Sequence, residues 1–277
     1  MTAPLLPISA ARVFCDGVFG TPRLAHPEGV AVHKDGSIWC GTENGDLIRI
    51  EPDGSAYTSM GSTNGFALGI AFDGDGNCYV CDMKHAAIFR RDAATGQIAR
   101  FAASGILVPN FPVVDVSHNA LFVSDSRGEG NPGPGIFRYD LDTGQGGAWS
   151  MEDWEFANGM ALDATGTGLF VIESFLGRVR HVPILPDGSA GKATVTVDGL
   201  DGVLDGLALG PDGTLYISCY VPGRIYRCKP GGMVNVLIED KQAVVLAHPT
   251  NIALKGNRMY TANLGRWHIT EIDLTAI

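Results

Sequence analysis

The sequence is poor in charge, has no basic excess and lacks long apolar runs. Only 18% of its 277 residues are charged, and the formal net charge is −10 at pH 7. This acidic balance disfavours nucleic acids and anionic membrane surfaces as partners. No stretch approaches the ~20 apolar residues that a membrane-spanning helix needs, and the N-terminus lacks the basic start and apolar run of a secretory signal. We therefore expect a cytoplasmic protein that binds neither nucleic acid nor membrane.

The six cysteines form no convincing metal or redox motif. Cys78 and Cys81 make a CxxC pair, but an odd spacing on a strand points the two thiols to opposite faces. We interpret the cysteines as small buried core residues. Glycine, by contrast, is abundant: 37 glycines with 15 prolines and 45% hydrophobic residues fit many short strands joined by tight turns in a packed globule.

One five-residue phrase recurs six times, as EGVAV, LGIAF, NFPVV, NGMAL, DGLAL and TNIAL. The copies begin at Glu28, Leu68, Asn110, Asn158, Asp205 and Thr250. Successive starts lie 40, 42, 48, 47 and 45 residues apart. A period of ~40–50 residues with several short strands in each unit is typical of propeller blades. Equivalent positions of such a ring face its axis, so these six residues should converge.

Each unit is interpreted as four strands, and the two chain ends share the last blade. The third strand shows alternating polar and apolar residues, as in 46–50, and a fourth follows, as in 55–60. The chain ends after the third strand of unit six, whereas residues 11–19 precede unit one without a unit of their own. The sequence predicts one all-β domain over 1–277, a six-bladed β-propeller with four antiparallel strands per blade, closed by the N-terminal strand.

Strand direction decides which loops share a face with the channel entrance. The segments before each first strand and the loops between second and third strands lie at the same end of a blade. This face carries His26 and His248, each two residues before a phrase. It also carries the longest of these loops, 126–135, which is either a pocket wall or a surface excursion.

Four of the converging residues form a candidate metal site: Glu28, Asn110, Asn158 and Asp205. Two carboxylates and two amide oxygens, without thiolate or clustered imidazole, suit Ca²⁺, Mg²⁺ or Mn²⁺ better than a structural zinc. Two buried carboxylates facing one channel without a cation would repel each other. The residues alone also allow a wet channel that is merely lined by polar groups.

Several longer segments resemble the SMP-30/gluconolactonase/LRE-like family of six-bladed propellers across nearly the whole chain. They are HPEGVAV, VPNFPVVDVSHNALFVSDS, FANGMALDATGTGLFVIESFLGRVRHVPILPDGSAG, LDGLALGPDGTLYISCY and ANLGRWHI. The resemblance implies that Glu28, Asn110, Asn158 and Asp205 hold one catalytic divalent cation. Calcium is the expected ion, with Mn²⁺, Mg²⁺ or Zn²⁺ as alternatives. Family members hydrolyse lactones and relatives hydrolyse organophosphates, so the resemblance implies a metal-dependent lactonase or esterase.

The expected reaction is attack of water on a lactone or ester carbonyl polarised by the cation. The family resemblance makes Asp205 the first candidate for a group that assists this reaction, by taking a proton or by attacking the carbonyl itself. His26 and His248 are further catalytic candidates because imidazole titrates near neutrality. The alternative for each histidine is a turn residue bonded to the backbone before a proline.

Other residues are predicted to contact a small-molecule substrate. Leu68 and Phe111 depart from the sugar-lactonase pattern, which often has Asp after the blade-three Asn, and they make the inner wall more apolar. A less polar ester or lactone is therefore expected, with sugar lactones still open. Thr250 and Asn251 join this wall, and Arg178 could clamp a carboxylate or, alternatively, form a structural salt bridge.

Two other functions compete with the hydrolase. The blade-two segment 67–82 and FANGMALD also resemble strictosidine-synthase-like propellers, but retention of Glu28 and both asparagines speaks against that function. A non-catalytic binding propeller of the NHL or WD type is the third hypothesis. The chain lacks WD dipeptides, appended domains and a broad basic or hydrophobic surface signal. A monomer or small homo-oligomer is expected.

Overall fold

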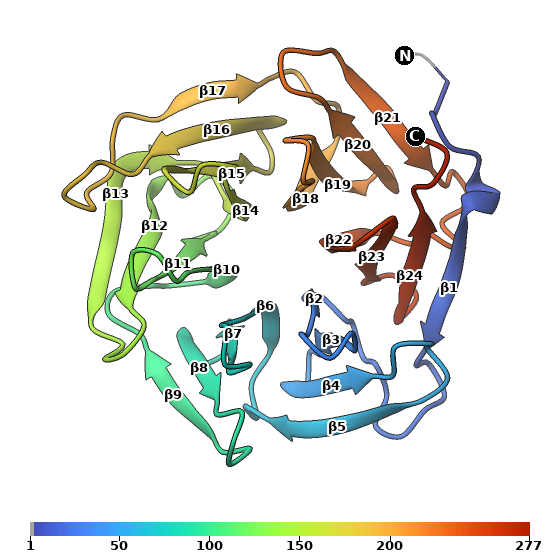
Figure 1. Ribbon diagram of the computed structural model, residues 1–277, viewed down its shortest axis with the longest axis horizontal. Helices are drawn as coiled ribbons and strands as arrows, with labels where there is room; N and C mark the ends of the chain where they lie inside the picture. Colours follow the sequence, from blue (N-terminus) through green and yellow to red (C-terminus); the bar gives the residue numbers. More distant parts are fainter. Residues whose placement is uncertain (1–2) are drawn as a thin grey trace.

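The computed structural model describes residues 3–277, and its strands form six four-stranded antiparallel sheets around a central axis (Figure 1). Blades 1 and 2 contain β2 (Val30–Val32), β3 (Ile38–Gly41), β4 (Asp46–Ile50), β5 (Tyr57–Ser62), β6 (Ala67–Phe72), β7 (Cys78–Asp82), β8 (Ala87–Arg91) and β9 (Ile98–Ala102). Blades 3 and 4 contain β10 (Pro109–Asp115), β11 (Ala120–Asp125), β12 (Gly133–Asp140), β13 (Gly146–Trp154), β14 (Ala157–Leu162), β15 (Gly168–Glu173), β16 (Arg178–Pro183) and β17 (Thr194–Val197). Blades 5 and 6 contain β18 (Val203–Leu209), β19 (Leu215–Val221), β20 (Arg224–Cys228), β21 (Val234–Glu239), β22 (Pro249–Lys255), β23 (Arg258–Asn263), β24 (His268–Asp273) and β1 (Ala11–Asp16). One short 3₁₀ helix, Ile8–Ala10, precedes β1.

The predicted six-bladed, all-β propeller is confirmed. The third strand predicted over 46–50 is β4 with the same bounds, and the fourth strand predicted over 55–60 is β5, shifted by two residues. The loop predicted over 126–135 is shorter, because β12 already begins at Gly133. Pairing with β13 across this sheet holds the last residues of that segment in the strand.

The apolar cores lie between neighbouring blades. Phe122 of blade 3 and Met160 of blade 4 belong to one buried cluster, and Leu204 of blade 5 packs with Ile172 of blade 4 in the next. Alternation along each strand sends successive side chains to the two flanking cores. The CxxC prediction follows this rule, since the cysteines at 78 and 81 are buried in different clusters.

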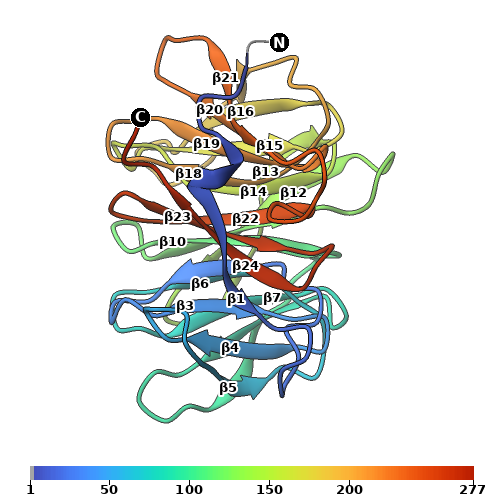
Figure 2. The ribbon, with the colours of Figure 1, turned by 90° about the vertical axis from the view of Figure 1, so that its right-hand side faces the viewer.

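The N-terminal strand closes the ring, as the sequence predicts. β1 pairs antiparallel with β24, from Ala11 opposite Ile272 to Asp16 opposite His268, and runs beside it in Figure 2. Phe14 is buried in the blade-6 to blade-1 core, where its ring meets Tyr260 edge-on at 5.0 Å.

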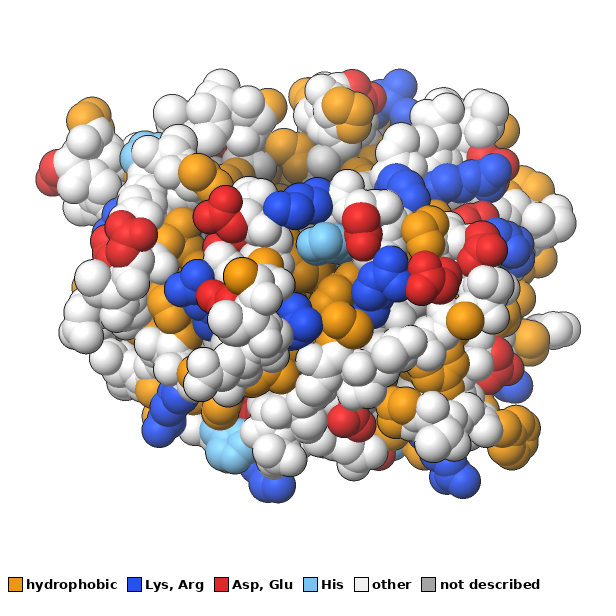
Figure 3. Space-filling model, turned by 60° about the horizontal axis from the view of Figure 1, so that its bottom comes forward, with side chains coloured by type: hydrophobic (Ala, Val, Ile, Leu, Met, Phe, Trp, Pro, Cys, Tyr) orange, Lys and Arg blue, Asp and Glu red, His pale blue; other side chains and the backbone are white. Residues whose placement is uncertain are grey.

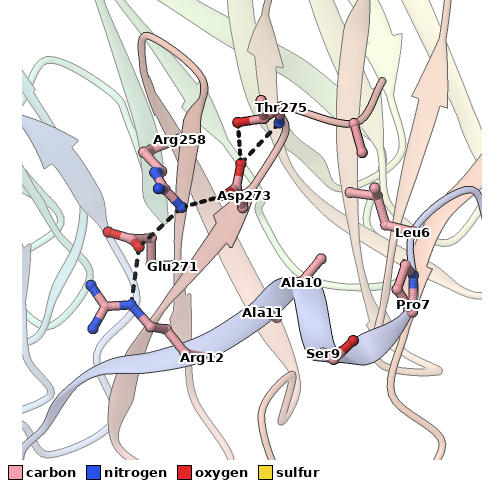
Figure 4. Close-up of a pocket in the computed structure, with 11 residues that line it drawn as sticks. Leu6, Pro7, Ser9, Ala10, Ala11, Arg12, Arg258, Glu271, Asp273 and Thr275 are labelled. Carbon is pink, nitrogen blue, oxygen red and sulfur yellow. Dashed lines mark hydrogen bonds and ion pairs between the residues drawn. The ribbon is translucent and has the colours of Figure 1, made fainter.

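Ion pairs lie on the outer side of the sheet that β1 and β24 form. Arg12 Nε donates to Glu271 Oε1 at 3.1 Å, and Arg258 Nη1 lies 2.9 Å from Asp273 Oδ2 (Figure 4). These groups line a cavity of about 400 Å³ at the blade edge, together with residues of the N-terminal segment. Arg12 and Arg258 are exposed to solvent, with 61% and 45% of their side-chain surface accessible, and this exposure limits the stability that the pairs contribute. The buried face of β1 is therefore the main source of closure energy.

Removal of one buried ring should weaken the closure. We expect Phe14→Ala to lower the free energy of unfolding by about 3–5 kcal/mol, because it opens a cavity between β1 and Tyr260. Val13→Ala, on the exposed side of the same strand, is the matched control and should cost about 0.5 kcal/mol or less. Urea unfolding followed by tryptophan fluorescence measures both. Equal losses in the two variants would contradict this account.

Candidate active site

Neighbouring innermost strands approach one another closely where each recurring phrase begins. A Cβ added to Gly29 would lie 2.3 Å from the Leu68 carbonyl oxygen, and one added to Gly159 would lie 2.5 Å from the Asp205 carbonyl oxygen. We call the first residue of each recurring phrase its ring residue. The glycine that follows a ring residue thus makes room for the ring residue of the next blade. This contact draws the beginnings of the innermost strands together around the axis.

The pairing register slips at the same place. In five blades the ladder between the first and second strands shows an irregularity that spans the ring position. In blade 4, for example, Ala157 and Met160 pair with β15, while Asn158 and Gly159 lie between them outside the ladder. A bulge of this kind re-aims a side chain, so the ring residues are released from the regular alternation of the strand.

Serine hydroxyls orient the two predicted asparagine ligands. Asn110 Nδ2 donates to Ser126 Oγ at 2.9 Å, and this hydroxyl in turn donates to the Ala157 carbonyl oxygen at 2.9 Å. Asn158 Nδ2 donates to Ser174 Oγ at 3.1 Å. Since Ser126 already uses its hydrogen, it must accept from the amide nitrogen, which fixes the amide orientation.

The opposite ends of these side chains present oxygen atoms without partners. Within residues 3–277, the Oδ1 atoms of Asn110, Asn158, Asp205 and Asn251 are buried and accept no hydrogen bond. A buried acceptor left unsatisfied costs about 1–3 kcal/mol. Unpartnered oxygens of this type are what a hard cation would use as ligands.

Two buried carboxyl groups interact electrostatically in this region. Burial raises the pKa of Glu28 well above its usual value, and the nearby negative charge of Asp205 raises it further. Burial also raises the pKa of Asp205 to about 7. The sequence-predicted pair is therefore brought within electrostatic reach, and its two negative charges oppose each other.

His26 lies just before the first innermost strand and is held by an acidic residue. Its Nδ1 hydrogen-bonds to Glu43 Oε2, and its ring meets Trp267 edge-on at 5.0 Å. The backbone of His26 has a φ of +42°. Positive φ in a non-glycine residue is strained and concentrates at functional sites.

His248 occupies the equivalent position before the last innermost strand, with a φ of +58°. Its Nδ1 donates to the Tyr220 carbonyl oxygen at 3.0 Å, and the two rings lie 4.6 Å apart with an interplanar angle of 31°. Phe156, at the corresponding place in blade 4, also has a positive φ of +52°. The bent backbone is thus shared by three blades, while the imidazoles belong to blades 1 and 6.

The predicted substrate residues fall into different environments. Leu68 is buried among apolar residues, and Phe111 is partly exposed and packs against the core between blades 3 and 4. Thr250 Oγ1 and Asn251 Nδ2 both donate to the Glu28 carbonyl oxygen, at 2.8 and 2.9 Å. Arg178 instead pairs with Glu173, with 2.5 Å between Nε and Oε2.

The sequence analysis did not identify three residues that contact the candidate residues: Ser126, Ser174 and Tyr220. The two serines do carry a sequence signal, since each directly follows the acidic residue that ends the second strand of its blade. Those acidic residues brace the entrance segments, because Asp125 accepts from the amides of Leu107 and Val108. Tyr220 has no comparable repeat signal.

The candidate cation-binding set needs its two asparagines, because its acidic residues alone are too few to hold a metal ion. Within residues 3–277, no three or more His, Cys, Asp or Glu side chains are grouped so that they could hold a metal ion. The set has only two acidic members, and amide oxygens would supply the remainder. The described part of the chain also has no helix with the length and apolar character needed to cross a membrane.

The fold is similar to those of several solved structures. A gluconolactonase from Xanthomonas campestris has a similar fold, with a TM-score of 0.77 at 17% identity over 95% of this chain and 89% of that one. A calcium-binding protein, regucalcin, from Agrobacterium tumefaciens gives 0.75 at 19% identity over 98% and 95%. At such identities the likeness concerns the fold alone.

Curated sequences and family models give a closer placement. An adipocyte plasma membrane-associated protein of Salmo salar is 23% identical over 240 residues, or 76% of this chain and 55% of that protein, so the chain spans about half the length of this relative. A strictosidine synthase-like N-terminal model matches residues 20–50. The SMP-30/Gluconolactonase/LRE-like region model matches residues 43–263, which is most of the chain. The protein therefore belongs to the SMP-30/gluconolactonase/LRE-like family.

Proposed function

We propose that the protein is a divalent-cation-dependent hydrolase that opens a lactone or a related ester. The observation that carries the proposal is that the buried Oδ1 atoms of Asn110, Asn158 and Asp205, at equivalent positions of three blades, have no hydrogen-bond partner within residues 3–277, while Asp205 interacts electrostatically with Glu28. Membership of a family that includes gluconolactonase in its name supports the reaction class. The similar folds of a gluconolactonase and of calcium-binding regucalcin are consistent with it.

The four residues fit a hard cation. Glu28, Asn110, Asn158 and Asp205 offer only oxygen, which suits Ca²⁺, and Mn²⁺ or Mg²⁺ are the nearest alternatives. Zinc is a weaker fit because it favours nitrogen and sulfur ligands. A bound cation would supply Lewis-acid polarisation of the substrate carbonyl. We assign Asp205, also a catalytic candidate by family resemblance, to holding this cation.

The two entrance histidines are suited to accepting a proton from water. A carbonyl oxygen can only accept, so His248 carries its hydrogen on Nδ1 and its Nε2 can receive a proton. Glu43 engages Nδ1 of His26 in the same way. Both side chains are partly exposed on the entrance face, where solvent water reaches them.

We propose a substrate less polar than a sugar lactone. Large apolar side chains are exposed on the loops of the entrance face, and we call this set the apolar rim. It comprises Phe19, Met83, Leu107, Phe175, Leu176, Val221 and Val244. Exposed apolar groups on this face favour a ligand with an apolar body. On the side of the molecule seen in Figure 3, basic and acidic groups are interspersed, without a broad field of one sign.

A strictosidine-synthase-like activity is the second candidate, favoured by the match over residues 20–50. That segment contains Glu28 but ends before both asparagines. A reaction of that class would not require the asparagine oxygens, so metal dependence separates the two candidates. The non-catalytic binding propeller predicts neither metal dependence nor turnover.

Chelation and reconstitution test the proposal directly. We expect hydrolysis of phenyl acetate or γ-nonanolactone to exceed that of glucono-δ-lactone, to disappear after chelation, and to return with Ca²⁺ more fully than with Mg²⁺, Mn²⁺ or Zn²⁺. Initial rates after each ion is restored separately provide the measurement. Hydrolysis that persists in chelator would contradict cation dependence, and preference for the sugar lactone would contradict the apolar substrate class.

Removal of one carboxylate should change cation binding without harming the fold. Wild-type protein should be stabilised by about 2.7 kcal/mol when Ca²⁺ is 100-fold above its dissociation constant. Asp205→Asn should lose this calcium-induced rise in unfolding temperature. Without calcium it should unfold at no lower temperature than wild type, because the opposing charge of Glu28 no longer has a partner to repel. Scanning calorimetry of both proteins with and without calcium provides the test, and an unchanged calcium shift in the variant would remove Asp205 from the site.

Loss of a serine that orients an asparagine ligand should lower the calcium affinity indirectly. Ser174→Ala leaves Asn158 Nδ2 without its acceptor, so the amide can turn away. Partners of metal ligands typically contribute 10- to 100-fold in affinity, and we expect calcium affinity by titration calorimetry to fall within that range. Ser189→Ala, in an exposed turn of the same blade, is the control and should bind calcium normally. Equal affinities for the two variants would refute the orienting role.

A further inference from the structure

We propose that Tyr220 is a substrate-binding residue of this site, whose hydroxyl donates a hydrogen bond to an oxygen of the lactone or ester, and that His248 positions it. This inference rests on the proposed function and adds a residue that has no role in the cation set. The argument depends on the place of Tyr220 above the ring, the availability of its hydroxyl and the restraint on its ring.

Tyr220 lies one layer above the ring residues, toward the entrance. It is the penultimate residue of β19, on the same face of that strand as Ser218. Ser218 Oγ donates to the Thr250 carbonyl oxygen at the ring. Two residues closer to the entrance on each strand, Tyr220 stacks on His248. The two contacts follow each other along the interface between β19 and the start of β22, and the Tyr220–His248 contact lies nearer the end of the blades where the innermost strands begin.

The Tyr220 hydroxyl is free to donate a hydrogen bond. Burial raises the pKa of Tyr220, and the negative charges of Glu28 and Asp205 raise it further. The phenol therefore stays protonated at neutral pH. Its side chain is only partly buried, and no hydrogen bond to its hydroxyl is present within residues 3–277.

Several independent features hold the aromatic pair in place. His248 both donates to the Tyr220 carbonyl oxygen and packs its ring against that of Tyr220. A Cβ at residue 265 would lie 2.5 Å from His248 Cδ2, so Gly265 provides the space in which the imidazole lies. The positive φ of His248 costs conformational energy that these contacts must offset. These contacts hold the two aromatic rings in a fixed position relative to each other.

This geometry suits an uncharged ester group with an apolar body. An ester has two oxygens, and a site that polarises one needs a separate donor to fix the orientation of the other. A neutral phenol supplies such a donor without requiring a charged substrate, and its ring offers apolar surface to the body of the ester. Substrate orientation is therefore the step in which Tyr220 acts.

The decisive comparison is Tyr220→Phe with Tyr216→Phe. The first variant keeps the ring on His248 and removes only the hydroxyl. Tyr216 lies on the same strand and face but is buried between blades 5 and 6, so its variant is the matched control. On calcium-loaded protein with γ-nonanolactone, we expect Tyr220→Phe to lower kcat/KM about five- to tenfold, chiefly through KM. Calcium affinity and unfolding temperature should match those of wild type, and Tyr216→Phe should behave as wild type.

A binding measurement separates this inference from the proposed function. Titration calorimetry with hydroxynonanoate, the ring-opened product, should give about fivefold weaker binding to Tyr220→Phe than to the control. If wild type hydrolyses nothing but product binding depends on the Tyr220 hydroxyl, the proposed function fails and this inference stands. If wild type is active and the two variants have equal kcat/KM and equal product affinity, Tyr220 has no role while the hydrolase remains. Absence of both turnover and binding in wild type would overturn both.

Discussion

The pairing of β1 with β24 is the constraint on which the rest of the structure depends. It gives the innermost strand of every blade a neighbour on both sides, so six short strands must share one narrow axis. Gly29 approaches the Leu68 carbonyl closely, and Gly159 approaches the Asp205 carbonyl closely, between adjacent blades of this ring. Convergence of polar groups at the axis is therefore a consequence of closure, and the residue types at those positions determine the chemistry.

Much of the fold was predictable because the repeat is local. Each blade carries its own alternation and turns, and the missing fourth strand of the last unit identified residues 11–19 as the closing piece. The site was less predictable because its contacts join distant segments. Ser174 orients Asn158 from the next strand, and Thr250 reaches the Glu28 carbonyl across 222 residues of sequence. No pattern within one blade shows which asparagine keeps a side-chain oxygen without a partner, and the register slip at the first position of the phrase cannot be read from a period of two.

Two residues that were selected for their chemical type alone also show why the sequence could not settle the site. Phe111 replaces the glycine of the recurring phrase, and the sequence could not decide between channel wall and blade packing; the structure packs it against the core of blades 3 and 4. Arg178 could be a carboxylate clamp by sequence, yet Glu173 of the same hairpin already holds its guanidinium. Their roles toward substrate remain predictions, and the argument for an apolar substrate now depends more on the exposed rim than on Phe111.

The centre of the ring is unfavourable for a folded chain taken by itself. Two buried carboxyl groups raise each other's cost of ionisation, and several amide and carboxyl oxygens lack partners among the described residues. Such departures from local consistency concentrate at functional sites, where other parts of the fold compensate. Here the compensation comes from the apolar cores between blades, which lie away from the axis and can be optimised independently of it. A propeller thus separates the residues that stabilise it from those that face its axis, and this separation allows an electrostatically strained centre to persist.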